Sequence, residues 1–181
     1  MALKLPEINK TSNAWRFPIY LILGLVIGFL QVVFGDTLAV SDVTPDILLV
    51  LVVWICFAEQ RWVATVFGFL LGIMFDIISN DVMGLNAFAK TIGAFVGSTL
   101  LIYSEKEGRF YTRFKFMLVL VIASLLHNII YFFFSLRPTE IDLLDFLLYK
   151  SGYFTLYTAI FGIIALLLSP PKSIERDDEW D

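Results

Sequence analysis

The chain has 181 residues, of which 59% are hydrophobic and only 17% are charged, and its formal net charge is −4. Its mean hydropathy is +0.82. Soluble domains contain about 45–50% apolar and about 25% charged residues, so this composition excludes an ordinary soluble domain and indicates an integral membrane protein. At about 20 residues per span, the length accommodates about six transmembrane helices with short loops.

The composition does not indicate a metal or a cofactor. The chain has one cysteine, Cys56, and one histidine, His127. A single cysteine cannot form an internal disulfide, and the sequence lacks the Cys/His spacing of a metal site. It also lacks a basic patch for nucleic acid. The sequence therefore predicts no cofactor, no metal and no nucleic-acid partner.

Six apolar segments follow a polar N-terminal stretch. Residues 1–16 lack the apolar core and cleavage site of a secretory signal, so we expect a cytoplasmic tail. The apolar segments cover residues 17–35, 45–58, 62–79, 84–103, 114–136 and 145–168. They predict an all-α integral membrane protein with a six-helix transmembrane domain over residues 17–168. Residues 169–181 form an acidic tail, expected to be cytoplasmic.

Lysine and arginine are distributed asymmetrically over the predicted loops. With the N-terminus inside, ten of them fall in the inner tails and loops, whereas the outer loops carry only Arg137. This bias follows the positive-inside rule when the number of spans is even. We therefore expect a multi-pass protein with both termini in the cytoplasm.

The second apolar segment opens with Pro45 and Asp46. Proline has the backbone angle of a first helical turn, and an acidic side chain there is stabilised by the helix dipole. Helix capping is the favoured role of Asp46, and a role in ligand binding is the alternative.

Glycines recur at four-residue spacing in three of the apolar segments. Residues four apart share one face of a helix, and small residues there let two helices approach closely in lipid. These glycines are predicted to pack against helices of the same chain or against a partner helix, with the first pair the more open case. The pairs are Gly24 and Gly28, Gly68 and Gly72, and Gly93 and Gly97.

Asp76 and Lys90 are charged residues within the third and fourth apolar segments. Charged side chains inside a membrane usually pair with one another or face the bundle interior. Only a short turn joins these segments, so the two residues fall at similar depth. We expect an ion pair between them. The alternatives are that both side chains extend to the outer headgroups, or that they belong to a proton or ion relay.

His127 and Asn128 lie deep in the fifth segment. A lone histidine in a membrane helix is more often a hydrogen-bonded interior residue than a catalytic one. The sequence has no HExxH motif, no paired carboxylates and no nucleophile motif. It therefore predicts no catalytic residue and no enzyme activity.

The second to fourth segments resemble the core of the MreD family, the bacterial rod shape-determining membrane proteins. The shared pattern is a proline and an acidic residue opening a span, then GFxxGxxxD, then a glycine and a span rich in small residues. The matching residues are Pro45, Asp46, Gly68, Phe69, Gly72, Asp76, Gly84 and Ala87.

The resemblance implies a non-enzymatic scaffold of cell elongation in the bacterial inner membrane. It implies direct binding to MreC, and an assembly with MreB, RodZ, RodA and a penicillin-binding transpeptidase that makes peptidoglycan. It also implies a bundle similar to the substrate-binding subunits of energy-coupling-factor transporters. A small-molecule (vitamin) binding subunit of such a transporter is therefore the alternative function, and membrane lipid is an expected partner in both cases.

Overall fold

The computed structural model describes residues 15–41, 43–102, 109–135 and 143–168. Over these residues the chain is helical, with one isolated bridge between Val40 and Val43 and no β-sheet. The helices are α1 (Arg16–Leu38), α2 (Ile47–Ala58), α3 (Arg61–Ser79), α4 (Leu85–Ile102), α5 (Arg109–Ser135) and α6 (Leu143–Leu168).

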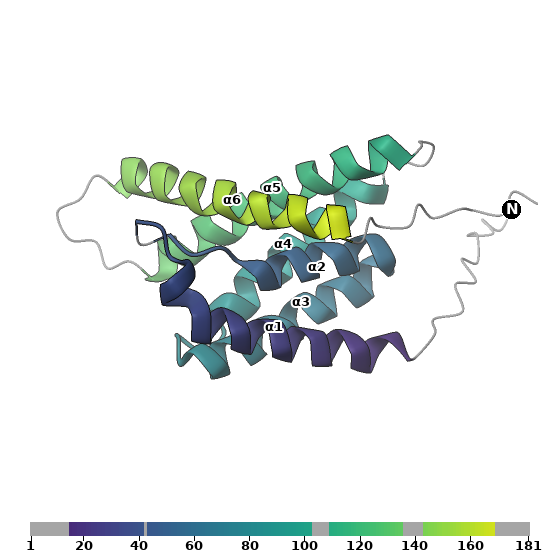
Figure 1. Cartoon of the computed structure of the whole chain (residues 1–181), viewed down its shortest axis with the longest axis horizontal. Coiled ribbons are helices and arrows are strands. Elements are labelled where there is room, and N and C mark those ends of the chain that lie inside the picture. The colour runs from purple at the N-terminus through teal and green to yellow at the C-terminus, as the bar shows by residue number, and fades with distance from the viewer. Residues whose placement is uncertain (1–14, 42, 103–108, 136–142, 169–181) are drawn as a thin grey trace, which may run out of the picture.

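The helices run back and forth along one axis, so that α1 begins at the same end of the bundle at which α6 ends (Figure 1). We call this the terminal end. The opposite end holds the start of α2 and the turn between α3 and α4, and we call it the far end. The acidic tail at residues 169–181 and most of the N-terminal tail lie outside the described residues.

Four of the described helical segments are long and apolar enough to cross a membrane. They are Arg16–Leu38, Arg61–Ser79, Arg113–Ser135 and Tyr149–Leu168. Helix α2 and the apolar part of α4, Leu85–Leu101, are shorter. The all-helical prediction is therefore confirmed. Length and composition support four of the six spans expected from the sequence, and the other two stay a prediction.

Two helix boundaries differ from those expected by three residues or more. Helix α5 begins at Arg109, before the apolar segment that was predicted to begin at residue 114. Helix α1 runs past Gly35 to Leu38. Hydropathy marks only the apolar part of a helix, and backbone hydrogen bonding continues into polar residues at its ends.

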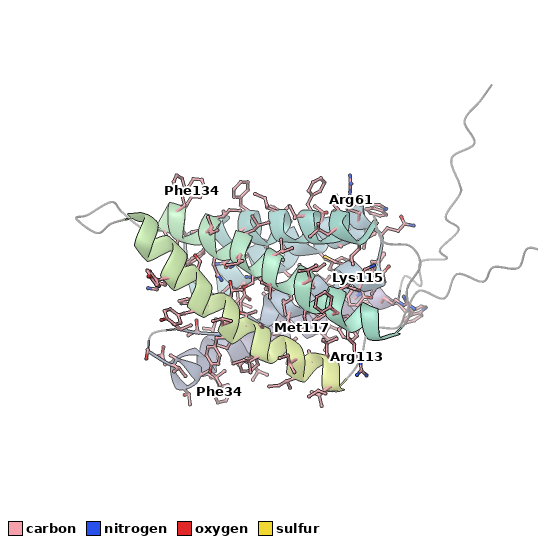
Figure 2. All side chains as sticks on the ribbon, turned by 90° about the horizontal axis from the view of Figure 1, so that it is seen from above. Phe34, Arg61, Arg113, Lys115, Met117 and Phe134 are labelled. Atoms are coloured by element: carbon pink, nitrogen blue, oxygen red, sulfur yellow. The ribbon has the colours of Figure 1, made fainter. Side chains whose placement is uncertain are left out.

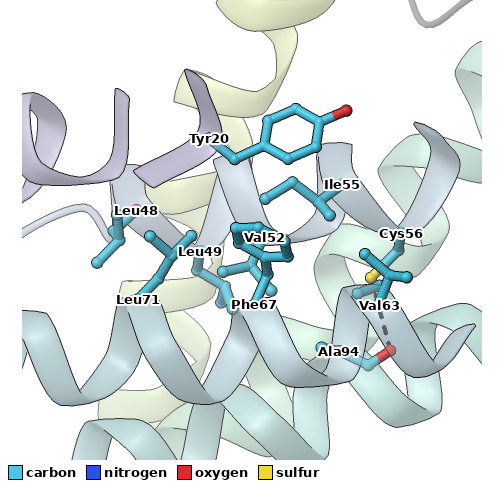
Figure 3. Close-up of a cluster of buried hydrophobic side chains, with 11 residues drawn as sticks. Tyr20, Leu48, Leu49, Val52, Ile55, Cys56, Val63, Phe67, Leu71 and Ala94 are labelled. Carbon is cyan, nitrogen blue, oxygen red and sulfur yellow. Dashed lines mark hydrogen bonds between the residues drawn. The ribbon is translucent and has the colours of Figure 1, made fainter. Parts of the chain in front are cut away.

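Helix α2 is buried on two sides. On one side Leu48, Leu49 and Val52 pack with α3 and with Tyr20 of α1 (Figure 3). On the other side Val50 and Val53 pack against α5 and α6. Because α2 is apolar all round, it forms the centre of the bundle. Helix α1 lies at the edge, where only Tyr20, Gly24 and Gly28 are buried.

Candidate functional site

Lys90 of α4 is at the centre of a polar cluster near the far end of the bundle. Its side chain has no exposed surface. Its Nζ lies 2.5 Å from Asp46 Oδ2, 3.3 Å from Asn86 Oδ1 and 3.2 Å from His127 Nε2. An ammonium group has three donors and no acceptor, so each of these contacts uses one N–H. The buried charge is therefore fully hydrogen-bonded and paired with a carboxylate.

Asp46 has two roles at the start of α2. Its Oδ1 accepts a hydrogen bond of 2.9 Å from the backbone N–H of Leu49, which is the helix cap expected from the sequence. Its Oδ2 pairs with Lys90. The backbone N–H of Asp46 donates to the Thr158 hydroxyl at 3.0 Å, which connects this position to α6.

The contacts of His127 define its tautomer. Because the Lys90 ammonium can only donate, the His127 Nε2 beside it must accept and carries no proton. The proton is then on Nδ1, which lies 3.4 Å from Asn128 Oδ1 and donates to it. His127 is thus neutral and hydrogen-bonds to both Lys90 and Asn128. Its Nε2 also lies 3.6 Å from Asp46 Oδ2, but in this tautomer it carries no proton to donate.

The hydrogen bonds continue from α5 to α6. Asn128 Nδ2 donates to Ser124 Oγ at 3.3 Å and to Thr155 Oγ1 at 3.2 Å. All three side chains are buried. Helix α6 therefore accepts hydrogen bonds from the start of α2, through Thr158, and from α5, through Thr155.

Asn86 connects the cluster to the turn between α3 and α4. Its Nδ2 donates to Asp81 Oδ2 at 3.2 Å, while the Tyr131 hydroxyl donates to the same oxygen at 2.6 Å. The backbone N–H of Val82 donates to Asp81 Oδ1 at 2.8 Å. Asp81 is half-buried. It forms the outermost part of the cluster.

The prediction of an ion pair between Asp76 and Lys90 is wrong, because each side chain has other partners. The Asp76 side chain is buried and accepts hydrogen bonds from the backbone N–H groups of Gly84, Asn86 and Ala87, at 2.9, 3.1 and 3.3 Å. The carboxylate therefore holds the first turn of α4 and satisfies its free N–H groups. Lys90 points instead to Asp46, which the sequence alone placed on a separate helix end.

Close packing of α3 on α4 fixes where Lys90 enters the cluster. A Cβ on Gly72 would lie 2.4 Å from Ala87 Cα, and a Cβ on Gly68 would lie 2.9 Å from the Lys90 carbonyl oxygen. Both obstacles are backbone atoms. Only glycine lets the two helices approach this closely.

The other glycine pairs also face helices of the same chain. Gly24 and Gly28 face side chains of α3, and a Cβ on Gly24 would lie only 2.2 Å from Leu71 Cδ2. Gly93 and Gly97 face α5, with Ala123 O and Val119 Cγ1 at 3.4 and 3.0 Å from the added Cβ. The described contacts of all three pairs are therefore internal.

A partly open cavity of about 250 Å³ lies beside the polar cluster. All six helices or the segments that precede them contribute to its wall. The lining residues are Gln31, Thr44, Pro45, Asp46, Phe75, Asp81, Asn86, His127, Asn128, Tyr131, Phe132 and Phe154. Sequence reasoning singled out Asp46, His127 and Asn128, but it did not predict that Asp81 and the aromatic side chains would join them.

The described side chains contain no group of three or more His, Cys, Asp or Glu residues that could hold a metal ion. Cys56 is free and buried, and its Sγ donates to the Ala94 carbonyl.

The hydrogen bonds of the cluster give each buried charge a structural partner. The arrangement can hold four helices in register, and its cavity can admit a small group.

The fold and the cluster define a class of helical protein. Its apolar helices are long enough to cross a membrane, and a buried charged cluster joins them. Comparison with family models then gives the family. The chain belongs to the family of the rod shape-determining protein MreD, which matches over residues 10–171. This match confirms the resemblance seen in the sequence. No curated protein and no solved structure matches the chain.

Proposed function

We propose that this chain is a non-enzymatic membrane scaffold of the cell-elongation machinery. It binds MreC directly and links the MreB filament to peptidoglycan synthesis, in an assembly with RodZ, RodA and a penicillin-binding transpeptidase. The observation that carries the proposal is the match to a rod shape-determining family over almost the whole chain.

The distribution of polar and apolar side chains supports a structural role. The buried charges Asp46, Asp76 and Lys90 each have partners within the chain. By contrast, α1 exposes apolar side chains along its length, including Ile22 at 64% and Phe29 at 55%. In a membrane such a face packs against lipid or against another apolar helix. The transmembrane helix of a partner could therefore bind there.

We further propose that all six helices lie in the bacterial inner membrane, with residues 17–168 as the transmembrane domain and both termini in the cytoplasm. Figure 2 shows Arg61, Arg113 and Lys115 toward the terminal end and Phe34 and Phe134 toward the other. Such a bias supports a terminal end on the cytoplasmic side. The short helix α2 is shielded by its neighbours, and α4 packs with it through Ala94, which supports their place within the bundle.

Co-purification from a bacterial membrane extract tests the scaffold. The tagged chain is expressed with MreC, extracted in mild detergent and isolated through its tag. We expect MreC to be retained and an unrelated single-span protein with a periplasmic domain to be lost. Loss of MreC from a chain that still elutes as a folded species would contradict direct binding.

The alternative is a small-molecule (vitamin) binding subunit of a transporter, with the bundle similar to that of energy-coupling-factor systems. The cavity of about 250 Å³ beside the polar cluster favours it. Ligand pockets usually measure about 300–1,000 Å³, so this one is small for a vitamin. A vitamin bound to the purified chain in native mass spectrometry would support the transporter function over the scaffold.

A further inference from the structure

We infer that the cavity at the far end is a binding site for an alkylammonium group, carried either by a lipid headgroup such as ethanolamine or by a free small amine. This inference rests on the composition of the cavity wall and is independent of binding to MreC.

One carboxylate at the cavity has no cationic partner within the described part of the chain. Two carboxylates line it, Asp46 and Asp81. Asp46 is neutralised by Lys90, and His127 is neutral in the tautomer described above. Among the described side chains, no lysine, arginine or histidine nitrogen lies within 4.0 Å of the Asp81 carboxylate. Lys150 lies over the Phe132 ring, with its Nζ 5.4 Å from the ring centroid, and makes no ion pair with this carboxylate. Asp81 is therefore the position at which an incoming cation is favoured.

Asp81 is arranged as an acceptor with spare capacity. Its three hydrogen bonds come from the neutral donors Val82 N–H, Asn86 Nδ2 and Tyr131 OH. A carboxylate has about four acceptor positions, so one position remains for an incoming donor. These donors hold the side chain in place, which lowers the entropy lost when a ligand binds.

Aromatic rings supply the rest of the cavity wall. Phe75, Tyr131, Phe132 and Phe154 line it. The faces of aromatic rings attract cations within about 6 Å. Two lysines show that rings of this wall accept ammonium groups: Lys90 Nζ lies 5.3 Å from the Phe75 centroid, and Lys150 Nζ lies 5.4 Å from that of Phe132.

Lys90 also shows how this interior holds a primary ammonium group. It combines one carboxylate, one amide oxygen and one aromatic face. The cavity wall also offers a second carboxylate, Asp81, and a second aromatic side chain, Tyr131. The cavity lies at the far end, near the start of α2 and the end of α5. In the proposed topology this is the depth of the lipid headgroups.

Thermal unfolding of the detergent-purified, delipidated chain tests the site. The probes are phosphatidylethanolamine, phosphatidylglycerol with the same acyl chains, and methylammonium chloride, with sodium chloride at equal ionic strength as the blank. We expect phosphatidylethanolamine to raise the melting temperature by several degrees more than phosphatidylglycerol if the source is lipid. If the ammonium group belongs to a free amine, we expect methylammonium chloride to raise the melting temperature above that in sodium chloride.

The Asp81→Asn variant keeps the size of the side chain and removes its charge. We expect it to weaken ammonium binding at least about tenfold, as loss of a charge-assisted hydrogen bond does. Asp36→Asn removes an exposed carboxylate of α1 outside the cavity, and we expect it to bind like the wild type. If Asp81→Asn does not fold, Phe154→Leu replaces one ring by an apolar side chain and is expected to weaken binding about threefold or more.

Two results would overturn the inference. One is equal stabilisation by phosphatidylethanolamine and phosphatidylglycerol together with no effect of methylammonium. The other is full ammonium binding by the Asp81→Asn or Phe154→Leu variant in its folded form.

Discussion

Lys90 carries a full charge with no exposed surface, and side chains from the start of α2, from α4 and from α5 surround its ammonium group. A buried ion pair adds little net stability compared with an apolar pair of the same size, because both charges lose their hydration. We expect the pair to act through specificity, because an unpaired charge there is unfavourable and disfavours any register that separates Lys90 from Asp46.

Replacing Lys90 by methionine should leave Asp46 buried without its cation. We expect a loss of about 3–5 kcal/mol in the free energy of unfolding, or roughly 10 °C in melting temperature. Thermal unfolding in detergent measures it, and Arg113→Met, which removes an exposed cation, serves as control.

The double variant Asp46→Asn with Lys90→Met removes both charges and keeps an oxygen that caps α2. We expect it to be more stable than Lys90→Met alone, with a coupling energy above about 1 kcal/mol. Additive losses would mean that the two charges do not stabilise one another.

Replacing Asp76 by alanine should remove the acceptor of three backbone N–H groups in the first turn of α4. Each buried donor left unsatisfied costs about 1–3 kcal/mol, so we expect a loss of about 3 kcal/mol or more. Denaturation in detergent provides the measurement, with Asp36→Ala on the exposed side of α1 as the matched change. Unchanged stability and unchanged MreC retention in Asp76→Ala would show that this carboxylate does not hold the turn.

For individual residues, the sequence predicted roles that depend on neighbours along the chain but not partners on other helices. The capping role of Asp46 followed from Pro45 and the apolar run after it, because capping depends on neighbours along the chain. Its pairing with Lys90 did not follow, since depth along a helix can be estimated from sequence but the direction of a side chain around it cannot. His127 was expected to be a hydrogen-bonded interior residue, and its partners required the structure.

At the scale of elements, the packing of α3 on α4 positions the cluster. Gly68 and Gly72 remove the side chains that would separate the two backbones, and the turn between the helices uses Asn80 and Gly84 in left-handed conformations. The hydropathy pattern predicted these helices because apolar runs of this length are helical in a membrane. The start of α5 at Arg109 and the end of α1 at Leu38 did not follow from it, because helical hydrogen bonding continues into residues beyond the apolar run.

Replacing Gly72 by alanine should force α3 and α4 apart, because the new Cβ would lie 2.4 Å from Ala87 Cα. We expect a loss of about 2 kcal/mol or more, within the range for overpacking of a close-packed interior. The matched control is Gly152→Ala, since no atom lies within 4 Å of the Cβ added there. Thermal unfolding of the two variants side by side provides the comparison, and equal melting temperatures would contradict close packing at Gly72.

At the scale of the whole molecule, six described helices in alternating directions bring the start of α1 and the end of α6 to one end (Figure 1). The basic side chains Arg61, Arg113 and Lys115 gather toward that end (Figure 2). The proposed orientation therefore places the cavity and the turn between α3 and α4 on the outer side of the membrane.

Cysteine labelling measures this orientation. Cys56 is buried, so new cysteines can be added to the natural sequence. A membrane-impermeant maleimide should label Val82→Cys, whose parent side chain is 63% exposed, in intact cells. Arg113→Cys should react only after the membrane is opened. Labelling of Arg113→Cys in intact cells would reverse the orientation.

Restoration of cell shape tests the scaffold role most directly. The chain is expressed in a rod-shaped bacterium depleted of its own MreD, and cell length and width are measured by microscopy, with membrane levels of the chain measured in parallel. We predict that the wild type and Gly152→Ala restore rods and that Gly72→Leu, which cannot pack α3 on α4, does not. Round cells with normal membrane levels of the wild-type chain would contradict a role in rod shape.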